Sequence, residues 1–449
     1  MLKVDVIVIG GGIAGMTAAA FASRSGARVI LLEGSATFGG RARTRMVGGY
    51  HFNQGAHALY RDGFLHEALR DLGISLSGGA PPLNAGYFVA EGKLHRAPLG
   101  AEGLSATTLL TEPEKRELTQ LLGRLIAGTA APPSGTNLHD TLAALSKAPK
   151  VRAALAAMIR LTSIVHAPHT ADGAALLDQL RGAMMRSARY IDSGWGTMID
   201  ALEAACTALG ASLRSSSPVA SIERSDGWCA TLRDGSAVSA SAVILAVNPA
   251  QAAALYPALG TTGGPAEATP AKAACLDLGL ARLTRPDVLF ALDVDRPLYF
   301  SVHSGAARLA PDGAALVHAM RYIEPGETVG RGRLIAELEA FVDLVQPGWR
   351  AQERARQFLG AMPVHASLPL AAKRGLEGRP GGAVTDTAGL FIAGDWVGPA
   401  GMLADAAAAS GRHAGEVAAV FARNRSTCAN DWTRELTAAP RPILPETGA

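Results

Sequence analysis

The sequence predicts an α/β protein, with a Rossmann-like domain and a second, discontinuous domain of mixed α+β structure. Two observations predict this fold. A glycine-rich strand–turn–helix unit opens the chain at residues 4–25, and a strand, a Gly-Asp pair and an alanine-rich helix stand near its end at 390–412. A chain of 449 residues exceeds one typical core, so we expect two domains, or three at most.

The composition is that of a folded globular chain. Hydrophobic residues make up 48% and charged residues 18% of the sequence. The net charge of +3 is small, and it gives no support to nucleic-acid binding, which needs clustered Lys and Arg. The cysteines form no CxxC, so we expect reduced core thiols rather than a disulfide or a metal site. They are Cys206, Cys229, Cys275 and Cys428.

The first residues have a strand pattern rather than that of a targeting segment. The apolar run in MLKVDVIVIGGG ends in glycines and not in a small-residue cleavage site, so we expect no cleaved signal. The chain contains no uncharged apolar run of about 18 residues, and we expect a cytoplasmic protein. A mean hydropathy of +0.17 is compatible with peripheral membrane contact.

Residues 4–34 have the pattern of a nucleotide-binding βαβ unit. A β-branched run at 4–9, typical of a strand buried on both faces, leads into a GxGxxG motif, a helix and a second strand that ends at Glu33. The glycines permit a tight turn, approach of a pyrophosphate and close helix packing, while Glu33 can accept hydrogen bonds from ribose hydroxyls. This acid disfavours the 2′-phosphate of NADP. The expected cofactor contacts are Gly10, Gly12, Ile13, Ala14, Gly15, Glu33 and Gly34.

The residues after Glu33 distinguish FAD from NAD. Gly39, Gly40, Arg41 and Thr44 form a GGRxxT motif, and the sequence here resembles the flavoprotein superfamily of amine oxidases, protoporphyrinogen oxidases and phytoene desaturases. The resemblance implies a GR2-type FAD-binding domain in which Gly39, Gly40 and Arg41 lie along the diphosphate and ribityl chain. Arginine can pair with phosphate charge. A surface arginine in a glycine turn is the alternative for an isolated GGR, and the position after Glu33 disfavours it.

The segment from Tyr50 to Leu59 resembles the family segment that runs beside the isoalloxazine. Asn53 stands where the family commonly has Asp, so the usual charge is absent. The resemblance implies flavin contacts for Gly55, Ala56 and His57. His57 is the candidate catalytic residue, either handling a proton near the flavin or only orienting the loop, and the two roles stay open.

The closing motif FIAGDWVGPAGMLADAAAASGR resembles the second half of the family's cofactor site. The resemblance implies that Gly394 and Asp395 contact the ribityl or diphosphate region. Gly401, Met402 and Leu403 are expected to begin a helix whose positive end points at the flavin pyrimidine. Trp396 and Met402 are the candidate substrate contacts, although Trp396 can equally pack against the adjoining strand. Two weaker matches, at Val219 and Ala246, are expected to lie along FAD.

Patterns along the middle of the chain predict how the domains alternate. A capping box at 111–114 precedes leucines at helical spacing, strands follow at 219–247, and 271–379 is mixed. The mixed part contains the candidate pocket residues Tyr299, His303, His318, Arg321 and Tyr322, of a kind that is more often core. We expect the FAD-binding domain at 1–78, 190–250 and 385–426, helical and sheet parts of a substrate domain at 79–189 and 251–384, and a tail at 427–449.

The resemblance implies an FAD-dependent oxidoreductase in which flavin N5 accepts a hydride from a substrate carbon. Met402 stands where amine oxidases often have an aromatic residue, which favours dehydrogenation or desaturation of an apolar or ring-containing small molecule. No cysteine occurs in the closing motif, so we expect non-covalent FAD. Oxygen or another acceptor would reoxidise the flavin, no metal is expected, and the oligomeric state stays open.

Three alternatives remain. A flavin amine oxidase is the first. A non-catalytic prenyl-binding protein, similar to Rab escort proteins and GDP-dissociation inhibitors, is disfavoured because GxGxxG, Glu33, GGR and the Gly394-Asp395 pair are retained together. An NAD-only dehydrogenase is disfavoured because it would not explain the C-terminal motif.

Overall fold

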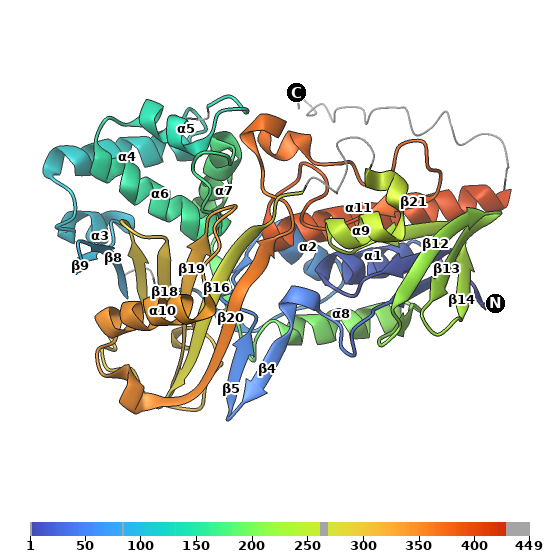
Figure 1. The fold of residues 1–449 in the computed structure, drawn as a ribbon, viewed down its shortest axis with the longest axis horizontal. Helices are drawn as coiled ribbons and strands as arrows, with labels where there is room; N and C mark the ends of the chain where they lie inside the picture. The colour runs from blue at the N-terminus through green and yellow to red at the C-terminus, as the bar shows by residue number, and fades with distance from the viewer. Residues whose placement is uncertain (1, 83–84, 131, 261–267, 428–449) are drawn as a thin grey trace, which may run out of the picture.

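The computed structural model describes residues 2–82, 85–130, 132–260 and 268–427 (Figure 1). A five-stranded parallel sheet, in the order β11-β3-β2-β15-β21, forms the centre of the first part. Its strands are β2 (Val6–Ile9), β3 (Val29–Leu32), β11 (Ser212–Arg214), β15 (Ala242–Leu245) and β21 (Leu390–Ile392). Strands from three separate stretches of the chain therefore build one parallel sheet, which confirms the predicted α/β fold class.

Two layers cover this sheet, because alternate residues of its strands face opposite sides. Val6 and Val8 pack with the helices, and Ile7 and Ile9 pack with an antiparallel meander. The helices are α1 (Ile13–Arg24), α2 (Phe64–Asp71), α8 (Gly196–Ala208) and α11 (Leu403–Thr427). The meander is formed by β12 (Val219–Ser225), β13 (Gly227–Leu232) and β14 (Ala237–Ala240), and β1 (Leu2–Lys3) joins β14. β14 was not predicted, and α9 (Pro249–Leu255) follows β15.

Small residues bring α11 against α1, as predicted for the alanine-rich helix. A Cβ atom at Gly411 would collide with the carbonyl oxygen of Ala14, and one at Gly415 would collide with that of Ala18. The two helices therefore pack backbone to backbone, which brings the start of α11 close to the glycine-rich turn before α1.

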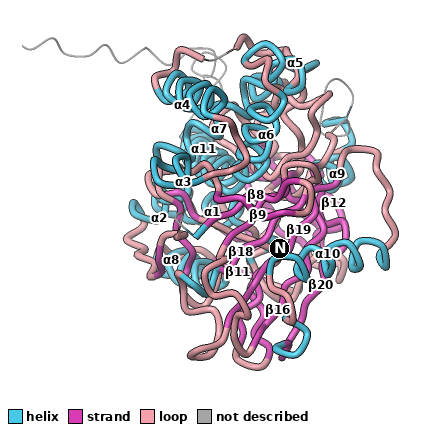
Figure 2. The backbone as a smooth tube through the Cα atoms, turned by 90° about the vertical axis from the view of Figure 1, so that its left-hand side faces the viewer, coloured by secondary structure: helices cyan, strands magenta, loops and turns pink. Residues whose placement is uncertain are grey.

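A seven-stranded sheet in the order β20-β16-β19-β18-β17-β8-β9 forms the second part of the molecule. Its strands are β8 (Gly86–Ala90), β9 (Lys93–Arg96), β16 (Ala271–Leu280), β17 (Phe290–Asp293), β18 (Leu298–Val302), β19 (Ala315–Ile323) and β20 (Glu353–His365). One face packs against α10 (Arg331–Val345), and the other packs against a helical layer (Figures 1 and 2). That layer contains α3 (Gly100–Ala106), α4 (Glu112–Ile126), α5 (Leu138–Leu145), α6 (Pro149–Ser163) and α7 (Gly173–Met185).

Short strands connect the two parts. They are β4 (Thr44–Val47), β5 (Tyr50–Asn53), β6 (Leu59–Tyr60), β7 (Gly78–Gly79) and β10 (Ala188–Ile191). β10 pairs with β6 and with β7, and β4 and β5 form a hairpin. The segment 79–189 contains most of the helical layer, but it also supplies β8 and β9 to the sheet built mainly by 271–365. The division into domains stays a prediction.

Local signals were predicted accurately where they depend on neighbouring residues. The capping box is formed at the start of α4, where Glu114 accepts a hydrogen bond from the backbone N–H of Thr111.

Cys206, Cys229 and Cys275 are free, whereas Cys428 and the tail from residue 428 onward lie outside the described residues. Within the described ranges, no helix has the length and apolar character needed to cross a membrane.

Candidate active site

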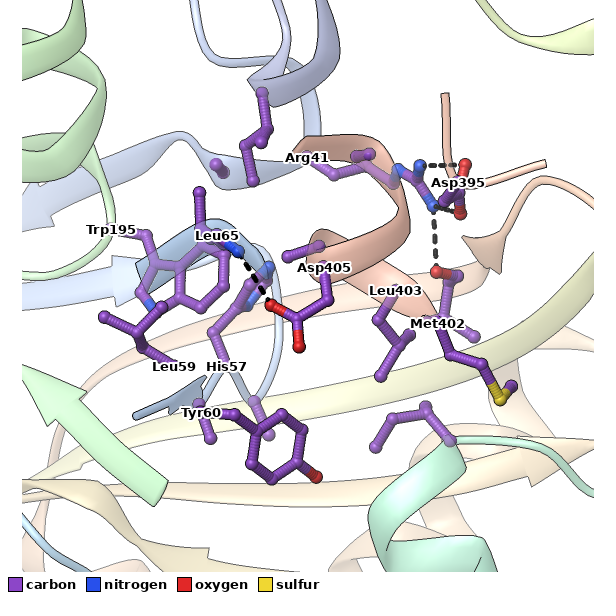
Figure 3. Close-up of a pocket in the computed structure, with 18 of the residues that line it drawn as sticks. Arg41, His57, Leu59, Tyr60, Leu65, Trp195, Asp395, Met402, Leu403 and Asp405 are labelled. Carbon is purple, nitrogen blue, oxygen red and sulfur yellow. Dashed lines mark hydrogen bonds and ion pairs between the residues drawn. The ribbon is translucent and has the colours of Figure 1, made fainter. Parts of the chain in front are cut away.

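One cavity of about 1630 Å³ extends from the glycine-rich turn to the face of the seven-stranded sheet. Figure 3 shows part of it, with side chains from β6, α2 and α11, and with His57 and Trp195 from the loops after β5 and before α8, converging on the same space. The predicted site residues that line the cavity are Gly10, Gly12, Ile13, Ala14, Glu33, Gly39, Gly40, Arg41, Ala56, His57, Ala246, Gly394, Asp395, Trp396, Met402 and Leu403. The sequence motifs from both ends of the chain therefore meet at one cavity.

The start of α1 forms one end of the cavity. Gly12 is the N-cap of this helix and has no side-chain capping bond, and the first turn carries no acidic side chain. The first N–H groups of α1 are thus free to bind an anion, and a Cβ atom at Gly12 would meet no atom within 4 Å. Nearby, the Glu33 carboxylate accepts hydrogen bonds from the N–H groups of Gly11 (2.6 Å) and Ser35 (2.7 Å), which leaves further acceptor sites for hydroxyls.

Five predicted cofactor residues do not line the cavity: Gly15, Gly34, Gly55, Val219 and Gly401. Three of them shape the backbone around it. A side chain at Gly15 would collide with the carbonyl oxygen of Gly10, and Gly55 and Gly401 have φ angles of +85° and +71°. Gly34 lies beside Pro218, and Val219 begins β12 of the meander and packs against the apolar core next to it.

Arg41 and Asp395 form an ion pair across the cavity wall (Figure 3). The guanidinium contacts the two carboxylate oxygens at 2.8 and 3.0 Å, and the N–H of Ala366 donates to the same carboxylate at 3.0 Å. Burial alone would raise the pKa of Asp395, but the charge and hydrogen bonds of Arg41 outweigh it and hold this pKa below its usual value. Both residues were predicted to contact FAD, and the structure shows that they also contact each other.

His57 stands in the loop after β5 and lies against the ring of Trp195, with ring centroids 4.7 Å apart. Its Nδ1 is 3.0 Å from the carbonyl oxygen of Gly55. A carbonyl can only accept, so Nδ1 carries a proton and Nε2 is the free acceptor. Burial, as the main cause, lowers the pKa of His57, so the ring is neutral at neutral pH. The geometry permits the proton-handling role and also provides the loop contact of the alternative role.

The start of α11 forms another part of the cavity wall. Met402 is buried and lines the cavity, and Leu403 begins the helix with a φ angle of +55°, which is uncommon for leucine. A residue held in this region typically costs about 1 kcal/mol and tends to occur at functional sites. Trp396 is buried, and its indole N–H donates to the carbonyl oxygen of Val247 at 3.1 Å. The packing contact of Trp396 is therefore present, and its contact with substrate stays a prediction.

The cavity lining also includes residues that were not predicted, among them Tyr60, Tyr190, Trp195 and Asp405. Trp195 is 3% exposed, and its indole nitrogen has no hydrogen-bond partner. Asp405 lies in the first turn of α11 and accepts a hydrogen bond from the N–H of Leu65 at 3.0 Å, and burial raises its pKa. Two of these residues are unusual in their sequence context, because Asp405 interrupts an alanine run and Trp195 lies between two glycines. No local sequence pattern indicated that Tyr60 and Tyr190 would line the cavity.

The five candidates in the mixed segment separate into three groups. Tyr299 and His303 line the cavity. His318 and Tyr322 are buried in the sheet behind them. Arg321 pairs with Glu327 and Glu337, so it has a structural role away from the cavity.

The residues present fit a flavin dinucleotide. The uncapped helix N-terminus with open space at Gly12 suits a diphosphate, Glu33 suits a ribose, and the unpartnered indole N–H of Trp195 needs an acceptor such as a flavin oxygen. The cavity exceeds the volume of about 300–1,000 Å³ that is common for one ligand, so a cofactor and a substrate can share it. The fold and the site thus define a dinucleotide-binding oxidoreductase.

Comparison with known proteins specifies the family. The model of the family described as "Flavin containing amine oxidoreductase" matches residues 13–273, which is more than half of the chain. The chain belongs to this family, and the family implies a flavin cofactor.

Individual proteins are more distant. A phytoene desaturase of Fusarium fujikuroi is 40% identical over 76 residues, which cover 17% of this chain and only 13% of the desaturase. An oxidoreductase from Methanosarcina mazei shares the fold with a TM-score of 0.74 at 18% identity, over 92% of this chain and 99% of that one. A double mutant of putrescine oxidase does so with a TM-score of 0.73 at 16% identity, over 93% and 99%. The structural likeness shows the fold alone.

Proposed function

We propose that the protein binds FAD non-covalently and uses it to dehydrogenate or desaturate an apolar or ring-containing small molecule. The observation that supports it most is that one cavity is lined both by the glycine-rich turn before α1 and by apolar and aromatic side chains from the second part of the molecule. The bound flavin would supply hydride acceptance at N5, and the chain's own residues would position the substrate and exclude water.

Several features support this reaction class. The far half of the cavity is lined by Leu122, Met158, Leu161, Ile164 and Leu180, which suit an apolar molecule. Among the described residues that line the cavity there is no lysine and no cysteine. The first absence disfavours the lysine-dependent amine oxidases, and the second supports non-covalent binding of the flavin.

Amine oxidation is the second candidate, favoured by one observation. Tyr60 and Trp195 bring aromatic rings to the part of the cavity that also contains His57 and Met402 (Figure 3). These rings could take the place of the aromatic residue that amine oxidases often have at the position of Met402. The known phytoene desaturase and the putrescine oxidase among the similar proteins do not decide between the two reactions, because the first match is short and the second concerns the fold.

A spectrum of the purified protein followed by anaerobic titration tests the proposal. We expect the absorbance of bound flavin, release of intact FAD on denaturation, and bleaching by a member of a panel of isoprenoids and porphyrinogens. Bleaching by amines alone would overturn the reaction class. A colourless protein that takes up no FAD would favour the non-catalytic prenyl-binding alternative. Repeating the titration in air shows whether oxygen reoxidises the reduced flavin or another acceptor is needed.

We also propose peripheral membrane contact by a protein located in the cytoplasm, through a surface that we call the methionine rim. It consists of Phe64, Ile126, Met184 and Met185, which are 38–61% exposed. Arg181 Nε donates to the carbonyl oxygen of Ile126, and Arg186 lies 3.9 Å from Asp405, so cations flank these apolar side chains. Met184 and Met185 also line the cavity, so the rim is continuous with an apolar interior. An anionic lipid surface matches this combination.

Replacing Met184 and Met185 with serine is expected to weaken binding to vesicles of phosphatidylcholine and phosphatidylglycerol by about tenfold or more, because two thioether side chains lose their burial in lipid. Co-flotation measures it. Met46→Ser is the matched control, since Met46 is 67% exposed on β4 and does not line the cavity. Equal flotation of all three proteins, or concentration-dependent self-association lost in the double variant, would contradict the membrane proposal.

A further inference from the structure

A row of polar side chains crosses the seven-stranded sheet behind the cavity. Gln357 of β20 is in register with Asp277 of β16, Asp277 with His318 of β19, and His318 with Ser301 of β18. Asp277 and His318 have no solvent exposure, and Ser301 has 1%. Buried polar groups cost free energy unless they are paired, so the partners of each group in this row decide whether it is tolerated in an apolar sheet.

Hydrogen bonds fix the row. His318 Nδ1 lies 2.7 Å from Asp277 Oδ1. A carboxylate can only accept, so Nδ1 of His318 carries a proton and its Nε2 faces away from Asp277. The side-chain amide of Gln357 donates to the other oxygen of Asp277 at 3.0 Å and to the backbone oxygen of Asn53 at 2.7 Å. The row is thereby tied to β5, the strand that precedes His57.

His303 connects this row to the cavity. It follows β18, lines the cavity and is 1% exposed. Its ring stacks on Tyr190 with centroids 3.7 Å apart and meets the His318 ring edge-on at 4.4 Å. Its Nε2 lies 3.3 Å from the hydroxyl of Tyr299. One nitrogen of each histidine, Nδ1 of His303 and Nε2 of His318, has no hydrogen-bond partner.

The surroundings of His303 keep the resting imidazole neutral. Burial, followed by the neighbouring His318 and His57, lowers its pKa well below the usual value, so the ring has a free lone pair but holds an added proton only where a negative charge stands nearby. Burial raises the pKa of Tyr190 and of Tyr299, so both phenols stay protonated. The only carboxylate in the row is Asp277, which can compensate an arriving positive charge through His318.

We propose that His303 accepts the proton released when substrate is dehydrogenated, with His318 and Asp277 as positioning residues behind it. This inference rests on the proposed function. One substrate C–H bond breaks with its electron pair and the hydride passes to the flavin. The second C–H bond loses a proton to His303, and its electron pair becomes the new π bond. The substrate is oxidised by two electrons, the flavin is reduced by two, and the His303–His318–Asp277 group holds the proton.

Proton uptake during photoreduction of the flavin-loaded protein tests this assignment without a substrate. A negative charge on the reduced cofactor would raise the low pKa of a neighbouring His303. The wild type is therefore expected to take up two protons per two electrons near neutral pH, one with the reduced cofactor and one on the histidine group. His303→Gln is expected to take up one. The reduction potential of the bound flavin, measured as a function of pH, reports the same difference. For a two-electron couple, each proton taken up adds about 30 mV to the change in potential per pH unit.

Three variants make the result specific. Asp277→Asn should also lose the second proton, and it substitutes for His303→Gln if that variant does not fold. His166→Gln is the matched control: burial lowers the pKa of His166 to about 4, but this histidine does not line the cavity, and uptake of two protons is expected. His57→Gln tests the competing acceptor.

Uptake of only one proton by the wild type would overturn the assignment to His303 while the proposed function stands. Loss of the second proton in His57→Gln but not in His303→Gln would do the same. A protein that binds no flavin would overturn both. Retention of two protons in His303→Gln, with normal flavin content, would reduce the row to a structural feature.

Discussion

Replacement of Gly15 by alanine is expected to abolish flavin binding and to lower the free energy of unfolding by about 3 kcal/mol or more. The added Cβ would collide with the carbonyl oxygen of Gly10, which is backbone in the turn between β2 and α1 and cannot move aside. Relief of the collision would push α1 away from β2 and open the turn that presents the first N–H groups of the helix. Urea unfolding and the flavin-to-protein absorbance ratio measure the two effects.

Gly12→Ala is the matched control, and it separates folding from cofactor binding. A Cβ atom at Gly12 would meet nothing within 4 Å, and its φ angle of −80° suits alanine. Stability is therefore expected to change by no more than about 0.5 kcal/mol. Flavin affinity should nevertheless fall about tenfold or more, because the methyl group would occupy the space through which a diphosphate approaches the helix. Normal flavin affinity in Gly12→Ala would contradict the placement of the diphosphate at α1.

The contrast between these glycines illustrates which parts of the site the sequence could predict. The β2–α1–β3 unit, the capping box of α4 and the start of the alanine-rich α11 depend mainly on nearby residues, and each was predicted close to its observed position. The predicted motif ends at Arg412, whereas α11 continues to Thr427. The family resemblance added the order of the motifs. The meeting of residues 10–41 and 394–403 at one cavity follows from the parallel sheet, because both segments come after strands whose carboxyl ends lie at the same edge.

Contacts that depend on long-range register were not predictable in the same way. Asp277, His318 and Gln357 are far apart in the sequence and lie within apolar or mixed strands, so no local pattern pairs them. Their row appears only when β16 is aligned with β19 and β20, and a shift of one residue would place each side chain on the opposite face. Trp195 and Asp405 were visible as unusual residues, but their direction toward the cavity depends on how α8 and α11 pack.

Removal of the Asp395 carboxylate is expected to have the second large effect. Asp395 has a 3% exposed side chain that joins the closing motif to Arg41 and to the N–H of Ala366. Asp395→Ala would leave a guanidinium and a backbone donor without this partner, at a cost of about 2–3 kcal/mol, and most of the bound flavin should be lost. Asp395→Asn keeps an acceptor for Ala366 and should cost about 1–2 kcal/mol.

The pH dependence of these variants identifies the charge as the cause. Because the pKa of Asp395 is lower in the folded protein than in the unfolded chain, its stabilising contribution is present above the unfolded value of about 3.9 and is lost as the pH falls through the folded value. The difference in unfolding free energy between the wild type and Asp395→Asn should therefore be constant near neutral pH and shrink below about pH 4.

Asp5→Asn is the control for this comparison. Asp5 also pairs with an arginine, Arg28, at 2.7 Å, and hydrogen bonding to that arginine lowers its pKa, but the pair lies at the protein surface and does not line the cavity. Its loss should cost less than about 1 kcal/mol and leave the flavin content unchanged. Equal losses of flavin in Asp5→Asn and Asp395→Asn, or full flavin content in Asp395→Ala, would show that the ion pair between the two ends of the chain does not hold the cofactor site together.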